Sequence, residues 1–170
     1  VTAKVELQRL PLLRRLHIDA KTWGQHPLHL HALHHLTHLE VGSRTPPAAE
    51  ALVHTVSRRC SLRQLQLTQS PAIEPLFGHL QGIRALELTN YHFSGQLLDL
   101  NPLAQLADLV IVVTGANSHV PLLAPMTHRG LTTVHLESDW VCTLLPQLPP
   151  SVTKLVLETP EGGVTHLPGA

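Results

Sequence analysis

The sequence is poor in charge and in long apolar runs, and each shortage excludes a class of partner. Only 14% of the 170 residues are charged, and 12 basic residues balance 12 acidic ones, so the formal net charge is zero. A surface that holds nucleic acid or an anionic membrane by charge normally has a clear basic excess. No apolar run approaches the ~20 residues of a membrane-spanning helix. The composition therefore predicts that neither nucleic acid nor a membrane is the partner.

Cysteines and aromatic residues are also scarce. Aromatics make up 3% of the chain and hydrophobic residues 43%, so the core must consist mainly of leucine and valine. Cys60 and Cys142 fit no metal-ligand spacing, and we expect both to be reduced and buried. Since no Asn-x-Ser/Thr acceptor occurs either, we predict an intracellular, cytoplasmic protein.

The length predicts one domain over residues 1–170, long enough to bury roughly 70% of the surface of the unfolded chain. The chain opens with VTAKVELQRL, which has neither an initiator methionine nor a signal-peptide pattern. We therefore expect this domain to be a fragment of a larger chain.

The leucines recur with a regular spacing. The pattern Leu-x-x-Leu-x-Leu, with Ile or Val allowed, occurs seven times, 21 to 26 residues apart (83 − 62 = 21 at the narrowest, 62 − 36 = 26 at the widest). The copies are LRRLHI at Leu13, LTHLEV at Leu36, LRQLQL at Leu62, IRALEL at Ile83, LADLVI at Leu106, LTTVHL at Leu131 and VTKLVL at Val152. The last two apolar positions of each copy alternate with polar ones, which is typical of a strand with one buried face. We expect strands at 15–18, 38–41, 64–67, 85–88, 108–111, 133–136 and 154–157.

These motifs resemble those of leucine-rich-repeat proteins over about residues 7–160. The resemblance implies an α/β solenoid of about seven repeats, whose strands form a concave parallel sheet over a shared core. The asparagine or cysteine that usually follows the strand in this family is replaced, for example by Ser70 and Tyr91, so the repeats are divergent.

The segments between the strands differ in helical character. TPPAAEALVHTVSRRC (45–60) predicts a helix with Thr45 as N-cap, and its unit resembles the longer repeats of intracellular F-box and ribonuclease-inhibitor-like proteins. The last unit contains LPQLPP and resembles the short bacterial-effector type of repeat. PAIEPLFGHL (71–80) and PLLAPM (121–126) are too rich in proline for long helices and predict short helical turns.

The stretch LHALHHLTHLEV (30–41) contains four histidines, His31, His34, His35 and His38. Their spacing would place them on one face of a helix, where two such histidines can hold zinc. His38 falls on a predicted strand, however, and Leu30 and Leu33 extend the every-third leucine pattern backwards. We therefore expect no metal site, with a histidine-rich metal-binding protein as the alternative.

Signals of catalysis are missing from the sequence. VVTGANSH (112–119) lacks the closing glycines of a dinucleotide-binding turn, and no Gly-x-Ser-x-Gly nucleophile elbow occurs. We predict that the protein is not an enzyme, with no catalytic residues and no cofactor.

The outward positions of the predicted strands suggest recognition. Acidic side chains (Asp19, Glu40, Glu87, Asp108, Glu137 and Glu158) outnumber the basic Arg15 and Lys154 on the open side. Exposed valines there have no obvious structural role. The predicted partner-binding residues are Val110, Val112, Val156, His135, Glu87, Glu40, His17 and Glu137. We expect a non-enzymatic protein–protein recognition scaffold for a basic or polar protein, as a substrate-receptor or adaptor module or a subunit of a larger complex; plain solvated surface is the simpler interpretation.

Overall fold

The structure is a computed structural model. It describes residues 10–19, 33–42, 53, 61–69, 74–90, 97–114, 122–126, 130–137, 148–158 and 164–168, and it describes only the backbone of Asp19, Leu122, Leu123 and 164–168. The predicted helix at 45–60, Leu30, His31, Cys60 and Cys142 lie outside these residues, except that Val53 within the helix is itself helical and buried.

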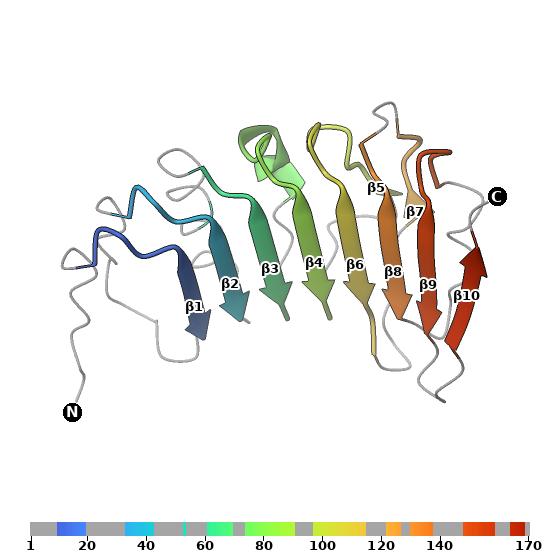
Figure 1. Cartoon of the computed structure of the whole chain (residues 1–170), viewed down its shortest axis with the longest axis horizontal. Helices are drawn as coiled ribbons and strands as arrows, with labels where there is room; N and C mark the ends of the chain where they lie inside the picture. Colours follow the sequence, from blue (N-terminus) through green and yellow to red (C-terminus); the bar gives the residue numbers. More distant parts are fainter. Residues whose placement is uncertain are drawn as a thin grey trace.

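One sheet of eight strands runs along the length of the molecule (Figure 1). The strands in their spatial order are β1 (Arg15–Asp19), β2 (His38–Gly42), β3 (Gln64–Thr68), β4 (Ala85–Thr89), β6 (Asp108–Val112), β8 (Thr133–Glu137), β9 (Lys154–Glu158) and β10 (Val164–Pro168). The first seven pair in parallel and lie where the leucine pattern predicts them. The seven predicted strands are confirmed, and the described chain forms a parallel-strand solenoid of stacked coils.

The register aligns equivalent motif positions from coil to coil. Leu39 on β2 pairs with Leu16 on one side and with Leu65 on the other. The residue before each strand continues the ladder, as when Arg63 N donates to Thr37 O at 2.8 Å and Arg84 N donates to Arg63 O at 2.7 Å. Each motif position therefore forms a column of side chains across the sheet.

The core consists of the leucines of the repeated pattern. The second and fourth residues of β2, β3, β4, β6 and β8 are buried, while their first, third and fifth residues stay half-buried or exposed on the opposite side. The pattern continues before the strands, where Leu33 and Leu36 are both fully buried and Leu36 N donates to Leu33 O. Each leucine buried in this way contributes about 1.5–3 kcal/mol to folding.

Helix is a minor element among the described residues. The described part of the segment 71–80 contains the 3-10 helix η4 (Glu74–His79), which confirms the predicted helical turn and buries Leu76 and Phe77. The prediction for 121–126 is wrong, because β7 (Leu122–Leu123) is extended. It pairs in parallel with β5 (Leu97–Leu98) in a second, two-stranded sheet, and Ala124 N donates to Leu98 O at 2.9 Å. Among the described residues, no helix has the length and apolar character needed to cross a membrane.

Strand β10 is an element that the leucine pattern does not predict. It pairs antiparallel with β9, so that Pro168 lies opposite Lys154 and His166 lies opposite Val156. The last parallel strand, β9, therefore pairs with an antiparallel strand, and β1 and β10 are the two edges of the described sheet.

Asn90 joins two neighbouring coils beyond the end of β4. It has a positive φ of 48°, and its Oδ1 accepts hydrogen bonds from Thr114 N at 2.8 Å and from Thr114 Oγ1 at 3.1 Å. An asparagine thus satisfies loop backbone here, one residue before the position at which the family pattern places it.

We expect Asn90→Ala to lower the free energy of unfolding by about 1–2 kcal/mol, because it leaves the Thr114 N–H without this acceptor and keeps the unfavourable φ. Asn90→Asp, which keeps the acceptor oxygen and also tolerates this φ, is the matched control. Urea unfolding of both variants measures the effect. A loss as large in the aspartate variant as in the alanine variant would contradict the role of the acceptor.

Candidate functional site

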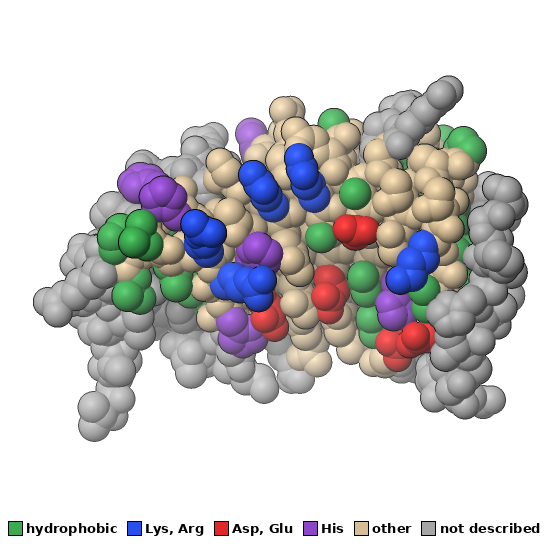
Figure 2. Space-filling model, viewed as in Figure 1, with side chains coloured by type: hydrophobic (Ala, Val, Ile, Leu, Met, Phe, Trp, Pro, Cys, Tyr) green, Lys and Arg blue, Asp and Glu red, His purple; other side chains and the backbone are tan. Residues whose placement is uncertain are grey.

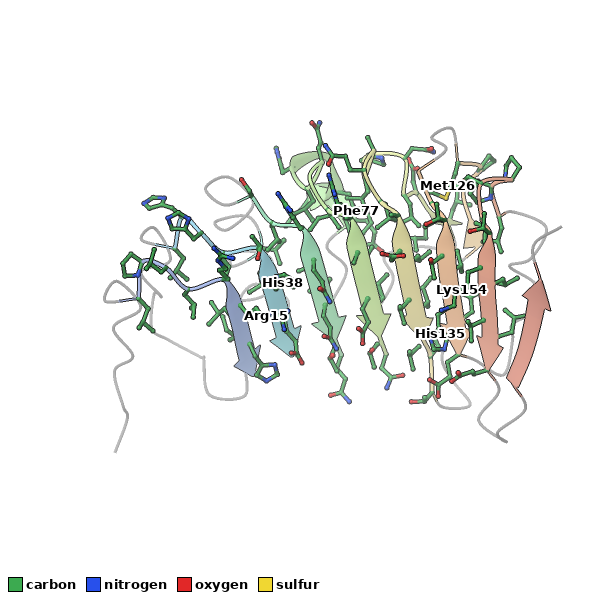
Figure 3. All side chains as sticks on the ribbon, in the orientation of Figure 1. Arg15, His38, Phe77, Met126, His135 and Lys154 are labelled. Atoms are coloured by element: carbon green, nitrogen blue, oxygen red, sulfur yellow. The ribbon has the colours of Figure 1, made fainter. Side chains whose placement is uncertain are left out.

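The side of the sheet opposite the core is the candidate functional surface, and we call it the open face. It consists of the first, third and fifth residues of the parallel strands and faces the viewer in Figures 2 and 3. Within the described residues, the second sheet and η4 do not lie over it (Figure 1). Residues from strands far apart in the sequence therefore share one surface.

The predicted binding residues His17 and Glu40 form a contact between β1 and β2. His17 Nδ1 lies 2.8 Å from Glu40 Oε2, and the two side chains are 61% and 39% exposed. A contact this exposed is screened by water and contributes little to stability. It does hold both side chains in position beside a shallow hollow of about 320 Å³, which Arg15, His38 and Gln66 also line.

Glu87 occupies the centre of the open face on β4. Its Oε1 accepts a hydrogen bond from Gln66 Nε2 at 2.8 Å and a longer one, 3.4 Å, from Thr89 Oγ1. The carboxylate is therefore held by polar neighbours from its own strand and from β3. It presents a fixed negative charge next to Val110, its partner on β6.

The three predicted valines differ in position and burial. Val110 and Val112 lie side by side on β6 and are half-buried. Val156 lies two strands away on β9 and is only 8% exposed. The expectation that Val156 is exposed is wrong. In the register it lies between His135 on β8 and His166 on β10. The accessible apolar spot is thus formed by Val110 and Val112.

His135 and Glu137 flank this spot on β8. In the register, His135 is the partner of Val110, and Glu137 is the partner of Val112. His135 Nε2 lies 3.5 Å from Glu158 Oε2, yet this atom is shielded from solvent and makes no hydrogen bond with the described residues. A shielded polar atom without a hydrogen bond is costly in free energy.

Charge on this side of the molecule is separated along the strand direction. Every described arginine and lysine stands either at the first residue of a strand or at the residue before it, namely Arg14, Arg15, Arg63, Arg84 and Lys154. The glutamates Glu40, Glu87, Glu137 and Glu158 stand at the third or fifth residues. Figure 2 shows most basic side chains near the starts of the strands and most acidic ones towards their ends.

The basic part of this pattern was not predicted, because alternation along the strands does not include the residues before them. Arg14, Arg63 and Arg84 stand one residue before their strands, at the second position of LRRLHI, LRQLQL and IRALEL. Repetition of arginine at that position is the signal that could have revealed it. The predicted acidic surface is therefore only the half near the strand ends, and a basic half lies near the strand starts.

The described histidines of 30–41 do not form a metal-binding group. His34 and His35 are exposed in the turn before β2, and His38 lies on β2 itself, near Arg15 (Figure 3). His38 Nδ1 lies 2.7 Å from Thr37 Oγ1, which also donates to Arg14 O at 3.2 Å. When Nδ1 of His38 carries the proton, it donates to Thr37 Oγ1, and the Thr37 hydroxyl remains free to donate to Arg14 O. Among the described residues no group of three or more His, Cys, Asp or Glu side chains is arranged to hold a metal ion.

Comparison of the chain with protein-family models, with curated proteins and with solved structures finds no match.

Proposed function

We propose that the chain is a non-enzymatic protein–protein recognition scaffold that binds its partner through the open face. The observation that carries this proposal is the regular surface made by the outward residues of seven parallel strands, with half-buried Val110 and Val112 between fixed polar groups. Apolar side chains surrounded by polar ones are typical of the centre of a protein interface.

In this proposal the fold is a divergent leucine-rich-repeat solenoid of about seven repeats in the α/β class, with the open face as its concave side. The support is the leucine pattern together with the strand register and the every-third burial of leucine or isoleucine before β2, β4 and β6. The protein acts as a substrate-receptor or adaptor module or as a subunit of a larger assembly, in the cytoplasm. The residues that contact the partner are Val110, Val112, His135, Glu87, Glu40, His17 and Glu137.

The charges of the open face indicate the chemistry of the expected partner. The part of the partner that contacts the glutamates of the open face needs basic or polar groups, because like charges at an interface are strongly disfavoured. Charged side chains at the periphery of an interface mainly change the association rate, whereas the apolar centre governs the dissociation rate.

Capture of partners from a cell extract tests the proposal when the chain and its Val110→Glu variant are compared. The expected result is at least one protein that the unaltered chain retains and the variant does not. Identical sets of captured proteins would count against the open face as the binding site.

A further inference from the structure

A hollow of about 510 Å³ lies beside the open face, at the starts of the first three strands. It is lined by three arginines and three histidines, Arg14, Arg15, Arg63, His34, His35 and His38. Thr37 and Ser61 complete the lining, so no acidic side chain takes part. We call this hollow with the adjacent Arg84 the basic rim.

The arginines of the basic rim are available to a ligand. Arg14, Arg63 and Arg84 are exposed, and none of them forms an ion pair with an acidic side chain of the described residues. Their backbones are fixed by the ladder, since Arg14 O and Arg63 O each accept two N–H groups of the next coil. Rigid attachment of exposed guanidinium groups favours binding of carboxylates or phosphates, which they can contact through two parallel hydrogen bonds.

The basic rim has a limited length. It crosses three strand-to-strand steps from β1 to β4, which corresponds to about 14 Å at the usual spacing of neighbouring strands. It ends at β6, where exposed Asp108 follows Ala107 in the next coil. Along the strands it is bounded by Glu40 and Glu87. A segment of about four extended residues fits this length, at roughly 3.4 Å per residue.

From this geometry we infer that the basic rim is a docking site for a short acidic segment of a protein chain, whose Asp or Glu carboxylates pair with Arg14, Arg63 and Arg84. A long polyanion such as a nucleic acid strand fits less well, because Asp108 and the glutamates of the open face interrupt its path. The lining contains no Phe, Tyr or Trp, which are common stacking platforms for bases. The inference rests on the proposed function in one respect, namely that the ligand belongs to a protein.

Fluorescence anisotropy of a labelled hexapeptide with four consecutive glutamates tests the site without any natural partner. We expect saturable binding at low ionic strength that weakens with added salt. Arg63→Glu should lower the affinity about tenfold or more, since it removes and reverses a charge-assisted contact. Arg63→Ala should show a smaller loss in the same direction.

Lys154→Glu is the matched control, because Lys154 is equally an exposed cation at the start of a strand but lies on β9, far from the basic rim. We expect this variant to bind the peptide with less than about a twofold change. Absence of peptide binding, or equal losses in Arg63→Glu and Lys154→Glu, would overturn the site. If a labelled oligothymidine of similar length bound more tightly than the peptide, the ligand of the basic rim would be a nucleic acid and not an acidic protein segment. Because the titration does not involve Val110, its failure is distinguishable from failure of the open face.

Discussion

Replacement of Phe77 by alanine is expected to lower the free energy of unfolding by about 3–5 kcal/mol. Phe77 is fully buried and is among the largest fully buried side chains of the described core. It projects from η4, the only 3-10 helix in the described part of the chain, into the leucines beneath the sheet. Alanine would remove its apolar contacts and leave a cavity that the regular coils on either side cannot close.

Gly78→Ala is the matched control in the same helix. Gly78 is exposed, and a Cβ added there meets no atom within 4 Å. This substitution should be neutral or should stabilise the chain by up to about 1 kcal/mol through the unfolded state. Urea or guanidinium unfolding followed by circular dichroism measures both variants. A loss below about 1 kcal/mol for Phe77→Ala would show that η4 does not belong to the core.

The second large effect concerns binding, and we expect Val110→Glu to weaken partner affinity by about 1–3 kcal/mol. The substitution places a carboxylate at the apolar centre of the open face, directly beside the fixed carboxylate of Glu87. The half-buried position allows the new side chain to reach water in the free chain. The free energy of unfolding should therefore change much less than the free energy of binding.

Leu97→Glu is the control for this prediction. Leu97 is a 59% exposed hydrophobic residue on β5, outside the eight-stranded sheet. Calorimetry with a purified captured partner should give nearly unchanged affinity for this variant. If Leu97→Glu weakened binding and Val110→Glu did not, the partner would contact the side of the second sheet instead.

The strands and their core were predictable from the sequence because one motif repeats. In LRQLQL, for example, the spacing places Leu62, Leu65 and Leu67 on the same side of the chain, and all three are buried. Neighbouring coils repeat this arrangement, so a single rule locates all seven strands. The outward residues follow from the same alternation.

The parts that were not predicted depend on contacts outside the motif. β10 lacks the leucine pattern, although Gly162 and Gly163 before it are typical of a hairpin turn. The burial of Val156, which lies opposite His166 of β10 in the register, was missed as well. β7 is only two residues long, so alternation could not identify it, and its extended form depends on pairing with β5.

The candidate site was predicted in part for a related reason. Glu40, Glu87, His17, His135, Val110 and Val112 all reach the open face because strand periodicity determines their side. Three arginines of the basic rim, Arg14, Arg63 and Arg84, stand before the strands, where that periodicity does not apply. Their grouping arises from the stacking of the coils, which brings positions 14, 63 and 84 together at one rim.

A photo-reactive amino acid at Gln66 tests most directly whether the open face binds the partner. Gln66 lies on β3 between Glu40 and Glu87 in the register, at the middle of that face. The same amino acid at Leu97 is the control on the second sheet. We expect irradiation in a cell extract to produce a covalent adduct with a protein partner from position 66 and none from position 97. Adducts from position 97 alone would contradict recognition through the open face.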